Sequence, residues 1–276
     1  MNKLSLGVSC AAMAISSLAL ADVAPLLGST TLSAVIADAL TQSGLAAQLS
    51  YQGGGSGEGE KALVEGKQGI APMSRAFKPE ALAKATAAGI KVVDHVIALD
   101  GVALFVNDAN QTPQLTFEQL GAIFGCSVSQ WQDVPGSNLS GHINVIVRDA
   151  ESGTTDTLKS LAGIKAFGPC VSVVAQSDDV ASATASDANA IGYAGLGGKR
   201  EHNREVALSK AAGTAAVLPN TATIRNFSYP LSRALHVYEA TGARQASAAE
   251  LQLLEKLNDR SFIDPIVQDH DFVTID

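Results

Sequence analysis

Apolar and polar residues along the chain follow two periods, one typical of helices and one typical of strands. Between residues 32 and 40 the apolar positions are spaced by three and four, which predicts an amphipathic helix ending near Gly44. Residues 70–73 form a short apolar run, which predicts a buried strand. Pro79 opens the next helical pattern and Gly89 closes it, as these residues commonly do at helix ends.

This alternation continues to the C-terminus. Capping boxes at Thr116–Gln119 and Ser247–Glu250 predict two further helix starts. Residues 91–106 have strand character, but Asp100-Gly101 predicts a break within them. Strands that alternate with helices predict an α/β protein with largely parallel sheets. The other expected elements are extended segments at 47–51, 143–147, 190–194 and 229–237, helices at 154–161, at 177–186 and from residue 60, and a loop at 131–141.

Composition and charge narrow the class of protein. The chain has 276 residues and 46% of them are hydrophobic, so it can bury a large core as one large domain or two small ones. Its formal net charge of -8 argues against a nucleic-acid partner, which normally needs a basic surface. Lys3, the apolar segment that follows it and the Ala19-Leu20-Ala21 motif predict a secretory signal peptide at residues 1–21. A membrane anchor is the alternative, but the apolar stretch is short for a span.

Two cysteines, Cys126 and Cys170, follow the predicted cleavage site. An even pair in an exported chain favours a disulfide, and two buried free thiols are the alternative. Neither cysteine has a histidine nearby to complete a zinc site, and the histidines are scattered along the chain. We therefore expect no metal site.

Segments rich in hydroxyls and glycines stand beside two of the predicted helices. Gly28-Ser29-Thr30-Thr31 directly precedes the first one, where free N–H groups and the positive end of the helix dipole suit an anion. An ordinary N-cap is the alternative, although three consecutive hydroxyls exceed what a cap requires. Gly53–Gly59 holds five glycines around Ser56, which lets the backbone approach a ligand closely. A flexible linker is the alternative there, whereas the Gly-Lys-Ser/Thr of a nucleotide P-loop is missing and a dinucleotide fingerprint is weak.

Two arginines follow predicted strands and have further hydroxyls beside them. Ser74-Arg75 comes after one strand, and Arg148 ends another, just before Ser152-Gly153-Thr154 at an expected helix start. Arginine forks, hydroxyls and helix-start amides together suit a tetrahedral oxyanion. Asp100 adds a lone carboxylate. A solvated surface residue is the alternative for Arg75, and a turn residue is the alternative for Asp100.

The serines of these clusters do not match a hydrolase nucleophile. None of Ser29, Ser56 and Ser152 lies in a Gly-x-Ser-x-Gly motif, and no histidine is placed as their general base. An enzyme acting on phosphoesters would need a metal cluster or an activated nucleophile, and the sequence indicates neither. We therefore expect a binding protein that is not an enzyme and uses no cofactor.

Taken in order, the clusters resemble the phosphate-binding proteins that serve bacterial phosphate ABC importers. The resemblance implies a two-lobed, type II periplasmic binding fold, with residues 22–102 and 233–276 in lobe one and residues 103–232 in lobe two. It also implies a periplasmic protein that binds inorganic phosphate in the interlobe cleft and delivers it to a membrane permease, and we expect a monomer. The matching segments are Gly28–Thr31, Tyr51–Gly57, Met73–Arg75, Ala98–Gly101, Leu115–Leu120, Arg148–Thr154, Ala190–Tyr193 and Tyr229–Arg233.

The chain departs from part of this family at Arg75, where some members have an aspartate that accepts the proton of hydrogen phosphate. Asp100 is then the candidate acceptor, and it would repel sulfate, which carries no proton. Another oxyanion (sulfate, molybdate or tungstate) is an alternative ligand, and a secreted sensor or adhesin is an alternative role. The residues that the resemblance places at the phosphate are Ser29, Thr30, Thr31 and Ser56 in lobe one, with Arg148, Ser152, Gly153 and Thr154 in lobe two. Ser74, Arg75 and Asp100 complete the predicted phosphate site.

Overall fold

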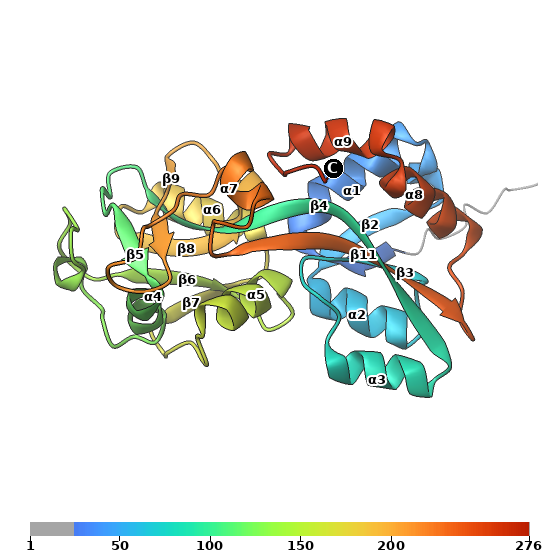
Figure 1. Ribbon diagram of the computed structural model, residues 1–276, viewed down its shortest axis with the longest axis horizontal. Coiled ribbons are helices and arrows are strands. Elements are labelled where there is room, and N and C mark those ends of the chain that lie inside the picture. Colours follow the sequence, from blue (N-terminus) through green and yellow to red (C-terminus); the bar gives the residue numbers. More distant parts are fainter. Residues whose placement is uncertain (1–24, 276) are drawn as a thin grey trace, which may run out of the picture.

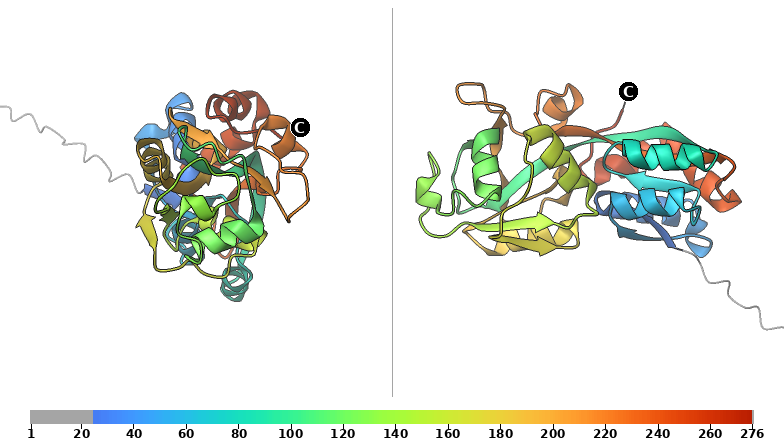
Figure 2. Two further views of the ribbon diagram at one scale, coloured as in Figure 1. Left: turned by 90° about the vertical axis from the view of Figure 1, so that its left-hand side faces the viewer. Right: turned by 90° about the horizontal axis from the view of Figure 1, so that it is seen from below.

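The computed structural model describes residues 25–275, which form two lobes side by side (Figure 1). The view from below, in the right-hand panel of Figure 2, shows the same two lobes meeting at one junction. Two long strands, β4 (Ile90–Asn107) and β11 (Ser232–Gly242), run through both lobes and join them. The two-lobed α/β fold expected from the sequence is confirmed, whereas the expected signal peptide lies outside the described residues.

Lobe one surrounds a core to which helices contribute most of the apolar side chains. The helix expected from the three-and-four spacing is α1, and its Val35, Ile36, Ala39 and Leu40 are buried as that spacing requires. Lobe one consists of β1 (Pro25–Gly28), η1 (Thr30–Leu32), α1 (Ser33–Gln42), η2 (Leu45–Ala47), β2 (Ser50–Gly54), α2 (Ser56–Val64), β3 (Ile70–Met73), α3 (Pro79–Ala87), α8 (Ala248–Asn258) and α9 (Arg260–Asp269).

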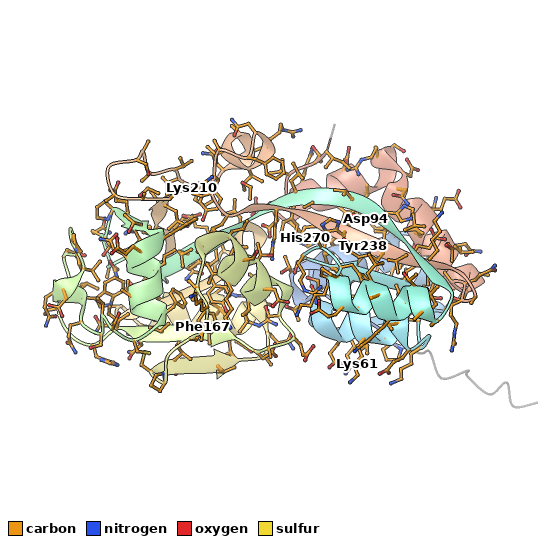
Figure 3. The ribbon with its side chains drawn as sticks, turned by 60° about the horizontal axis from the view of Figure 1, so that its bottom comes forward. Lys61, Asp94, Phe167, Lys210, Tyr238 and His270 are labelled. Carbon is orange, nitrogen blue, oxygen red and sulfur yellow. A yellow bond between two sulfur atoms is a disulfide. The ribbon has the colours of Figure 1, made fainter. Side chains whose placement is uncertain are left out.

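Lobe two has a core of its own, centred on large aromatic side chains. Phe124, Phe167 and Tyr193 pack with ring centroids 5.7–6.1 Å apart, and Figure 3 shows Phe167 inside this lobe. The capping box at Thr116 opens α4 as predicted. Lobe two consists of β5 (Gln114–Thr116), α4 (Phe117–Phe124), η3 (Trp131–Asp133), β6 (Asn144–Arg148), α5 (Gly153–Ala162), β7 (Val171–Val174), α6 (Ser177–Ser186), β8 (Ala190–Gly195), η4 (Leu196–Gly198), β9 (Asn203–Glu205), β10 (Ala207–Ser209) and α7 (Thr221–Arg225).

One seven-stranded sheet extends through both lobes in the order β3-β11-β4-β8-β6-β7, with β9 paired to β4. The strands β3, β11, β4 and β8 pair antiparallel, and only β8, β6 and β7 pair parallel within this sheet. Two separate pairs, β1 with β2 and β5 with β10, are parallel. The prediction of largely parallel sheets is therefore wrong, because the strands that join the lobes run in opposite directions.

Two local predictions also differ from the structure. Asp100-Gly101 does not interrupt the strand: β4 continues through both residues, and Asp100 lies opposite Arg233 of β11 in the ladder. The glycine-rich segment is the end of β2 and the start of α2, which begins at Ser56 and not at residue 60. Positive φ angles of 77°, 98° and 112° at residues 53–55 explain why glycine is needed at this sharp strand-to-helix turn.

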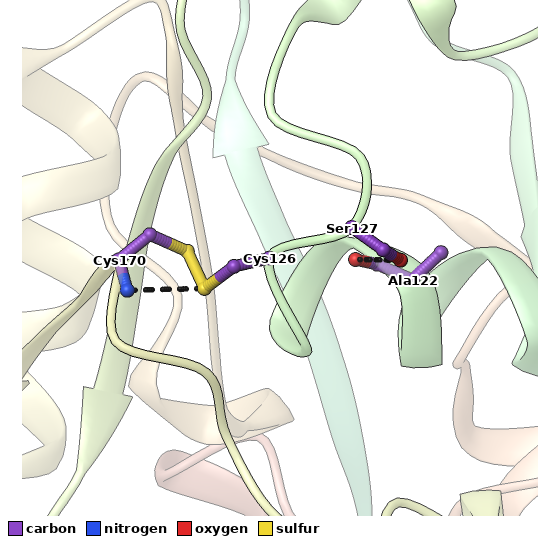
Figure 4. Close-up of a disulfide and its surroundings, with 4 residues drawn as sticks. All are labelled: Ala122, Cys126, Ser127 and Cys170. Carbon is purple, nitrogen blue, oxygen red and sulfur yellow. Dashed lines mark hydrogen bonds between the residues drawn. A yellow bond between two sulfur atoms is a disulfide. The ribbon is translucent and has the colours of Figure 1, made fainter.

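The predicted disulfide is present in lobe two (Figure 4). Cys126 follows α4 and Cys170 precedes β7, so the bond ties a helix end to an edge strand across a sequence separation of 44 residues. The Cys126 sulfur also accepts a hydrogen bond from the backbone N–H of Cys170, at 3.0 Å.

Candidate functional site

Four helix starts, two from each lobe, converge at the junction between the lobes. Ser29 is the N-cap of η1 and Ser56 is the first residue of α2 in lobe one. Ser152 is the N-cap of α5 and Ser177 is the first residue of α6 in lobe two. All four serines are buried. Because the first N–H groups of a helix have no intrahelical acceptor, the four starts bring backbone donors and positive dipole ends to one place.

Side-chain hydroxyls connect the lobes directly across this junction. The Thr30 and Ser177 hydroxyl oxygens are 3.1 Å apart, and those of Thr31 and Thr154 are also 3.1 Å apart. Each pair joins η1 of lobe one to a helix start of lobe two. The structure is therefore that of the closed arrangement, in which both halves of the predicted site face each other.

Gly153 lies at a close contact between the two lobes. A Cβ atom at this position would lie 2.3 Å from the Ser56 hydroxyl oxygen and 2.7 Å from that of Ser74. The backbone N–H of Gly57 donates to the carbonyl oxygen of Glu151 at 3.0 Å, so the backbones also meet across the junction. Because a side chain at either position would collide with the opposite lobe, glycine at 57 and 153 allows the two lobes to come together. Glycine there also leaves room for a ligand to come close to the backbone.

Arg148 is the buried cation at the centre of the cluster. Arg148 is only 2% exposed. Its Nη1 donates hydrogen bonds to Thr30 Oγ1 at 2.8 Å and to Ser177 Oγ at 2.9 Å. Its Nε and Nη2 are buried and have no hydrogen-bond partner, and no carboxylate within residues 25–275 forms an ion pair with it. Burial lowers the pKa of Arg148; the charges of Asp149 and Asp179 oppose this effect without cancelling it, and the like charge of Arg233 adds to it. Three N–H bonds of this guanidinium are thus available to an anion.

A buried hydrogen-bond network fixes the segment that carries Arg148. The Arg148 N–H donates to the Tyr193 hydroxyl at 3.2 Å, and that hydroxyl lies 2.7 Å from Thr155 Oγ1. The network ties the end of β6 to the first turn of α5. Burial raises the pKa of Tyr193 to about 12, so this hydroxyl stays neutral at physiological pH.

Arg75 does not point its donors at the junction centre, contrary to the prediction that it binds the anion. Its Nη1 and Nη2 donate to the two carboxylate oxygens of Glu60 at 2.7 and 3.1 Å, and its Nε donates to Asp156 at 2.8 Å. Burial alone would lower its pKa, but the two carboxylates raise the pKa overall. Because Asp156 belongs to α5, this side chain forms an ion pair between the lobes.

Asp100 belongs to the cluster but is held by an arginine that the sequence did not indicate. The Asp100 carboxylate is fully buried and accepts from Arg233 Nε at 2.9 Å and Nη2 at 2.6 Å. Its other oxygen accepts from the backbone N–H of Leu196 at 3.0 Å. The turn interpretation of Asp100 is wrong, because a strand pair and a buried ion pair hold it.

Two predicted serines, Ser29 and Ser152, have both capping and site positions. Ser29 Oγ accepts from the N–H of Thr31, and Ser152 Oγ accepts from the N–H of Thr155, each at 3.2 Å. Ser74 Oγ lies 3.2 Å from Ser56 Oγ. Capping uses only an oxygen lone pair, so the hydroxyl protons of Ser29 and Ser152 are still available as donors.

A cavity of about 380 Å³ opens beside the cluster, with Thr30, Thr31 and Ser177 in its wall. Within residues 25–275 no group of three or more histidine, cysteine, aspartate or glutamate side chains is arranged to hold a metal ion. In the same part of the chain, no helix has the length and apolar character needed to cross a membrane.

Sequence reasoning missed two residues of the cluster. Ser177 was expected only as the start of a helix, yet its hydroxyl binds Arg148. Arg233 appeared only as the end of a family-like segment, yet it contacts Thr31, Ser74 and Thr154. The one available signal was that Arg233 lies at a predicted crossing between the lobes.

Two lobes joined by paired strands, with anion donors from both lobes facing each other, define a two-lobed substrate-binding protein. The profile of the PBP superfamily domain matches residues 23–253. The chain belongs to this superfamily.

Individual relatives agree with this assignment. The chain is 34% identical over 202 residues to the phosphate-binding protein PstS of Pseudomonas aeruginosa, in an alignment that covers 69% of this chain and 62% of that protein. The PstS of Staphylococcus epidermidis is 30% identical over 200 residues, with 70% and 60% covered. The chain thus spans less than two thirds of the length of these relatives. A crystal structure from Clostridium perfringens, of a candidate phosphate ABC transporter substrate-binding protein with bound phosphate, is 25% identical with a TM-score of 0.70, and 91% of this chain and 98% of that one are covered.

Proposed function

We propose that the protein binds inorganic phosphate between its lobes and delivers it to an ABC-type phosphate importer. The observation that carries the proposal is Arg148: a guanidinium only 2% exposed, with no carboxylate partner in residues 25–275 and with Nε and Nη2 unpaired. An unpaired buried charge is costly, so a bound anion is the natural counter-ion.

The proposed ligand set surrounds this guanidinium from both lobes. The free N–H groups of Arg148, the amides at the start of α5 and the serine hydroxyls would donate to the anion oxygens. In this proposal residues 22–102 and 233–276 close as lobe one onto residues 103–232 as lobe two. The proposed ligands are Ser29, Thr30, Thr31, Ser56, Ser74, Arg148, Ser152, Gly153 and Thr154, with Ser177 added and Arg75 removed.

Phosphate is chosen over other oxyanions because the relatives are named for it. Both PstS relatives are phosphate-binding proteins, and the Clostridium perfringens structure holds phosphate. Asp100 remains the proposed acceptor of the phosphate proton: it accepts three hydrogen bonds, and a carboxylate has about four acceptor positions.

The proposed setting is the periplasm, after cleavage of a signal peptide behind Ala21. We propose a monomer without enzymatic activity, whose partner is a membrane permease. A role as a secreted sensor or adhesin would use the same site, and adjacent permease and ATPase genes would favour transport.

A panel of oxyanions tests the proposed function. Dialysed protein is heated with phosphate, sulfate, molybdate or tungstate, because a ligand that binds only the folded state raises the unfolding midpoint. We expect a shift with phosphate that is lost in Arg148→Gln, and titration calorimetry should confirm the loss. Arg204→Gln is the matched control, since Arg204 donates to the carbonyl oxygen of Asn110 in lobe two. A shift with sulfate or molybdate and none with phosphate would refute the choice of ligand.

A further inference from the structure

Arg233 is another buried arginine at the junction, beside Arg75 and Arg148, and it extends from a strand shared by both lobes. It lies directly opposite Asp100 in the β4–β11 ladder and is only 5% exposed. Its side chain reaches Thr31 and Ser74 in lobe one and Thr154 in lobe two. Through Arg233, the strands β4 and β11 that join the lobes are in contact with both halves of the site.

All five N–H bonds of the Arg233 guanidinium are used within the protein. Nε donates to Asp100 Oδ2 at 2.9 Å, and Nη2 donates to the same oxygen at 2.6 Å and to Thr31 Oγ1 at 3.3 Å. Nη1 donates to the Ser74 carbonyl oxygen at 3.1 Å and to Thr154 Oγ1 at 3.0 Å. A guanidinium has five N–H donors, so none is left for a ligand.

Thr31 and Thr154 each accept a hydrogen bond from Arg233 through their side-chain hydroxyls. Because Arg233 cannot accept a hydrogen bond, these hydroxyls must donate their protons to other groups. A hydroxyl has one proton and two lone pairs, and an arginine can only donate. Thr31 Oγ1 and Thr154 Oγ1 lie 3.1 Å apart, so one of them donates to the other. The second hydroxyl keeps its proton, and residue 233 offers no acceptor for it. One hydroxyl proton is thus left available to a third group at the junction.

We propose that Arg233, held in place by Asp100, is a positioning residue that sets the donor direction of Thr31 and Thr154 toward the bound anion. This inference rests on the proposed function and deepens it. Arg233 differs from Arg148, which has three unused N–H bonds, because it acts on the ligand only through the hydroxyls. Its hydrogen bond to Thr154 also joins the lobes, so the hydroxyls are aligned only when the lobes are closed.

A double-mutant cycle tests the proposal. Arg233→Gln replaces the donor-only group by one whose oxygen can accept a threonine proton, and Thr154→Val removes one of the two hydroxyls. Each single variant should weaken phosphate binding about tenfold in titration calorimetry, as expected for a hydrogen bond to a charged group. If Arg233 acts through the hydroxyl, the double variant should bind within about twofold of Arg233→Gln alone, because coupled residues are not additive.

Matched variants separate positioning from folding. Arg204→Gln, remote from the junction, should keep wild-type affinity, and Arg233→Lys, which can only donate, should bind more tightly than Arg233→Gln. If Arg233→Gln does not fold because Asp100 is left without its partner, the same cycle is run in an Asp100→Asn background, with Asp100→Asn alone as the reference.

The outcomes distinguish this inference from the proposed function. If wild-type protein binds phosphate but the two losses multiply to about a hundredfold, the positioning role is wrong and the proposed function stands. If another oxyanion binds in place of phosphate, the cycle is run with that oxyanion and read in the same way. If no oxyanion binds wild-type protein, both proposals fall.

Discussion

Replacing Gly153 by alanine should weaken ligand binding without destabilising either lobe. The added Cβ would lie 2.3 Å from Ser56 Oγ, 2.8 Å from Ser56 Cβ and 2.7 Å from Ser74 Oγ. Both serines belong to lobe one, whereas Gly153 begins α5 of lobe two. The clash therefore exists only while the lobes are closed, and separating them relieves it.

The size of the effect follows from the cost of overpacking a tight contact. Such a clash costs about 1–3 kcal/mol, which corresponds to a loss of roughly 5- to 150-fold in affinity if closure is required for binding. The unfolding midpoint of ligand-free protein should not fall, because alanine is a better helix former than glycine.

Titration calorimetry with phosphate gives the affinity, and small-angle scattering with and without phosphate gives the extent of closure. Gly121→Ala is the matched control: it lies inside α4, and its Cβ would meet nothing within 4 Å. This control should keep the wild-type affinity. If Gly153→Ala bound phosphate as tightly as wild type and compacted as fully, the contact between Gly153 and Ser56 would not belong to the bound state.

Three further predictions concern separate parts of the molecule. Asp100→Asn should reduce the selectivity for phosphate over sulfate, and an unchanged ratio in titration calorimetry would remove Asp100 from the mechanism. Breaking the Cys126–Cys170 disulfide should lower the free energy of unfolding by about 4 kcal/mol in the chain-entropy model, measured by urea unfolding with and without reductant, while phosphate affinity should not change. The raised pKa of Tyr193, about 12 against the usual 10, favours its neutral form in the folded state. Its contribution of about 3 kcal/mol is therefore complete below pH 10 and lost between pH 10 and 12, so Tyr193→Phe should flatten the alkaline fall in urea midpoint.

The parts of the site that are local in sequence could be predicted. A strand, an arginine and a capped helix start follow one another within residues 144–162, and the structure keeps that order from β6 to α5. The hydroxyl cluster before α1 could be found in the same way, because capping and helix periodicity act over a few residues.

The roles of the arginines could not be predicted, because their partners are distant in sequence. Arg75 is neutralised by Glu60 and Asp156, and Arg233 by Asp100, which is 133 residues away. Of these three arginines, only Arg148 has no carboxylate partner within residues 25–275. A single sequence indicates which residues carry charge, whereas their compensation depends on which strands and helices become neighbours.

The continuity of β4 through Asp100-Gly101 also depends on a partner that is distant in sequence. Asp100-Gly101 has the composition of a turn, but the pairing with β11 extends from Ile90 to Gly101 and supplies a buried partner for the carboxylate. Tertiary contact overrides local preference at this point. Because the two joining strands are long and antiparallel, the sheet is mixed, which the alternation of helices and strands did not indicate.

The joining ribbon of β4 and β11 limits how the two lobes can move. Sliding one strand along the other would break the backbone ladder between them, whereas bending or twisting the ribbon leaves the ladder intact. The open protein is therefore not two bodies on a loose tether, because the same two surfaces keep facing each other. The lobes close mainly by a change in the angle at which this ribbon bends. Little rotational freedom is therefore lost when the lobes meet. The two halves of the site therefore already face each other before the lobes close. Even a ligand as small as a single oxyanion needs to hold them through only a short movement.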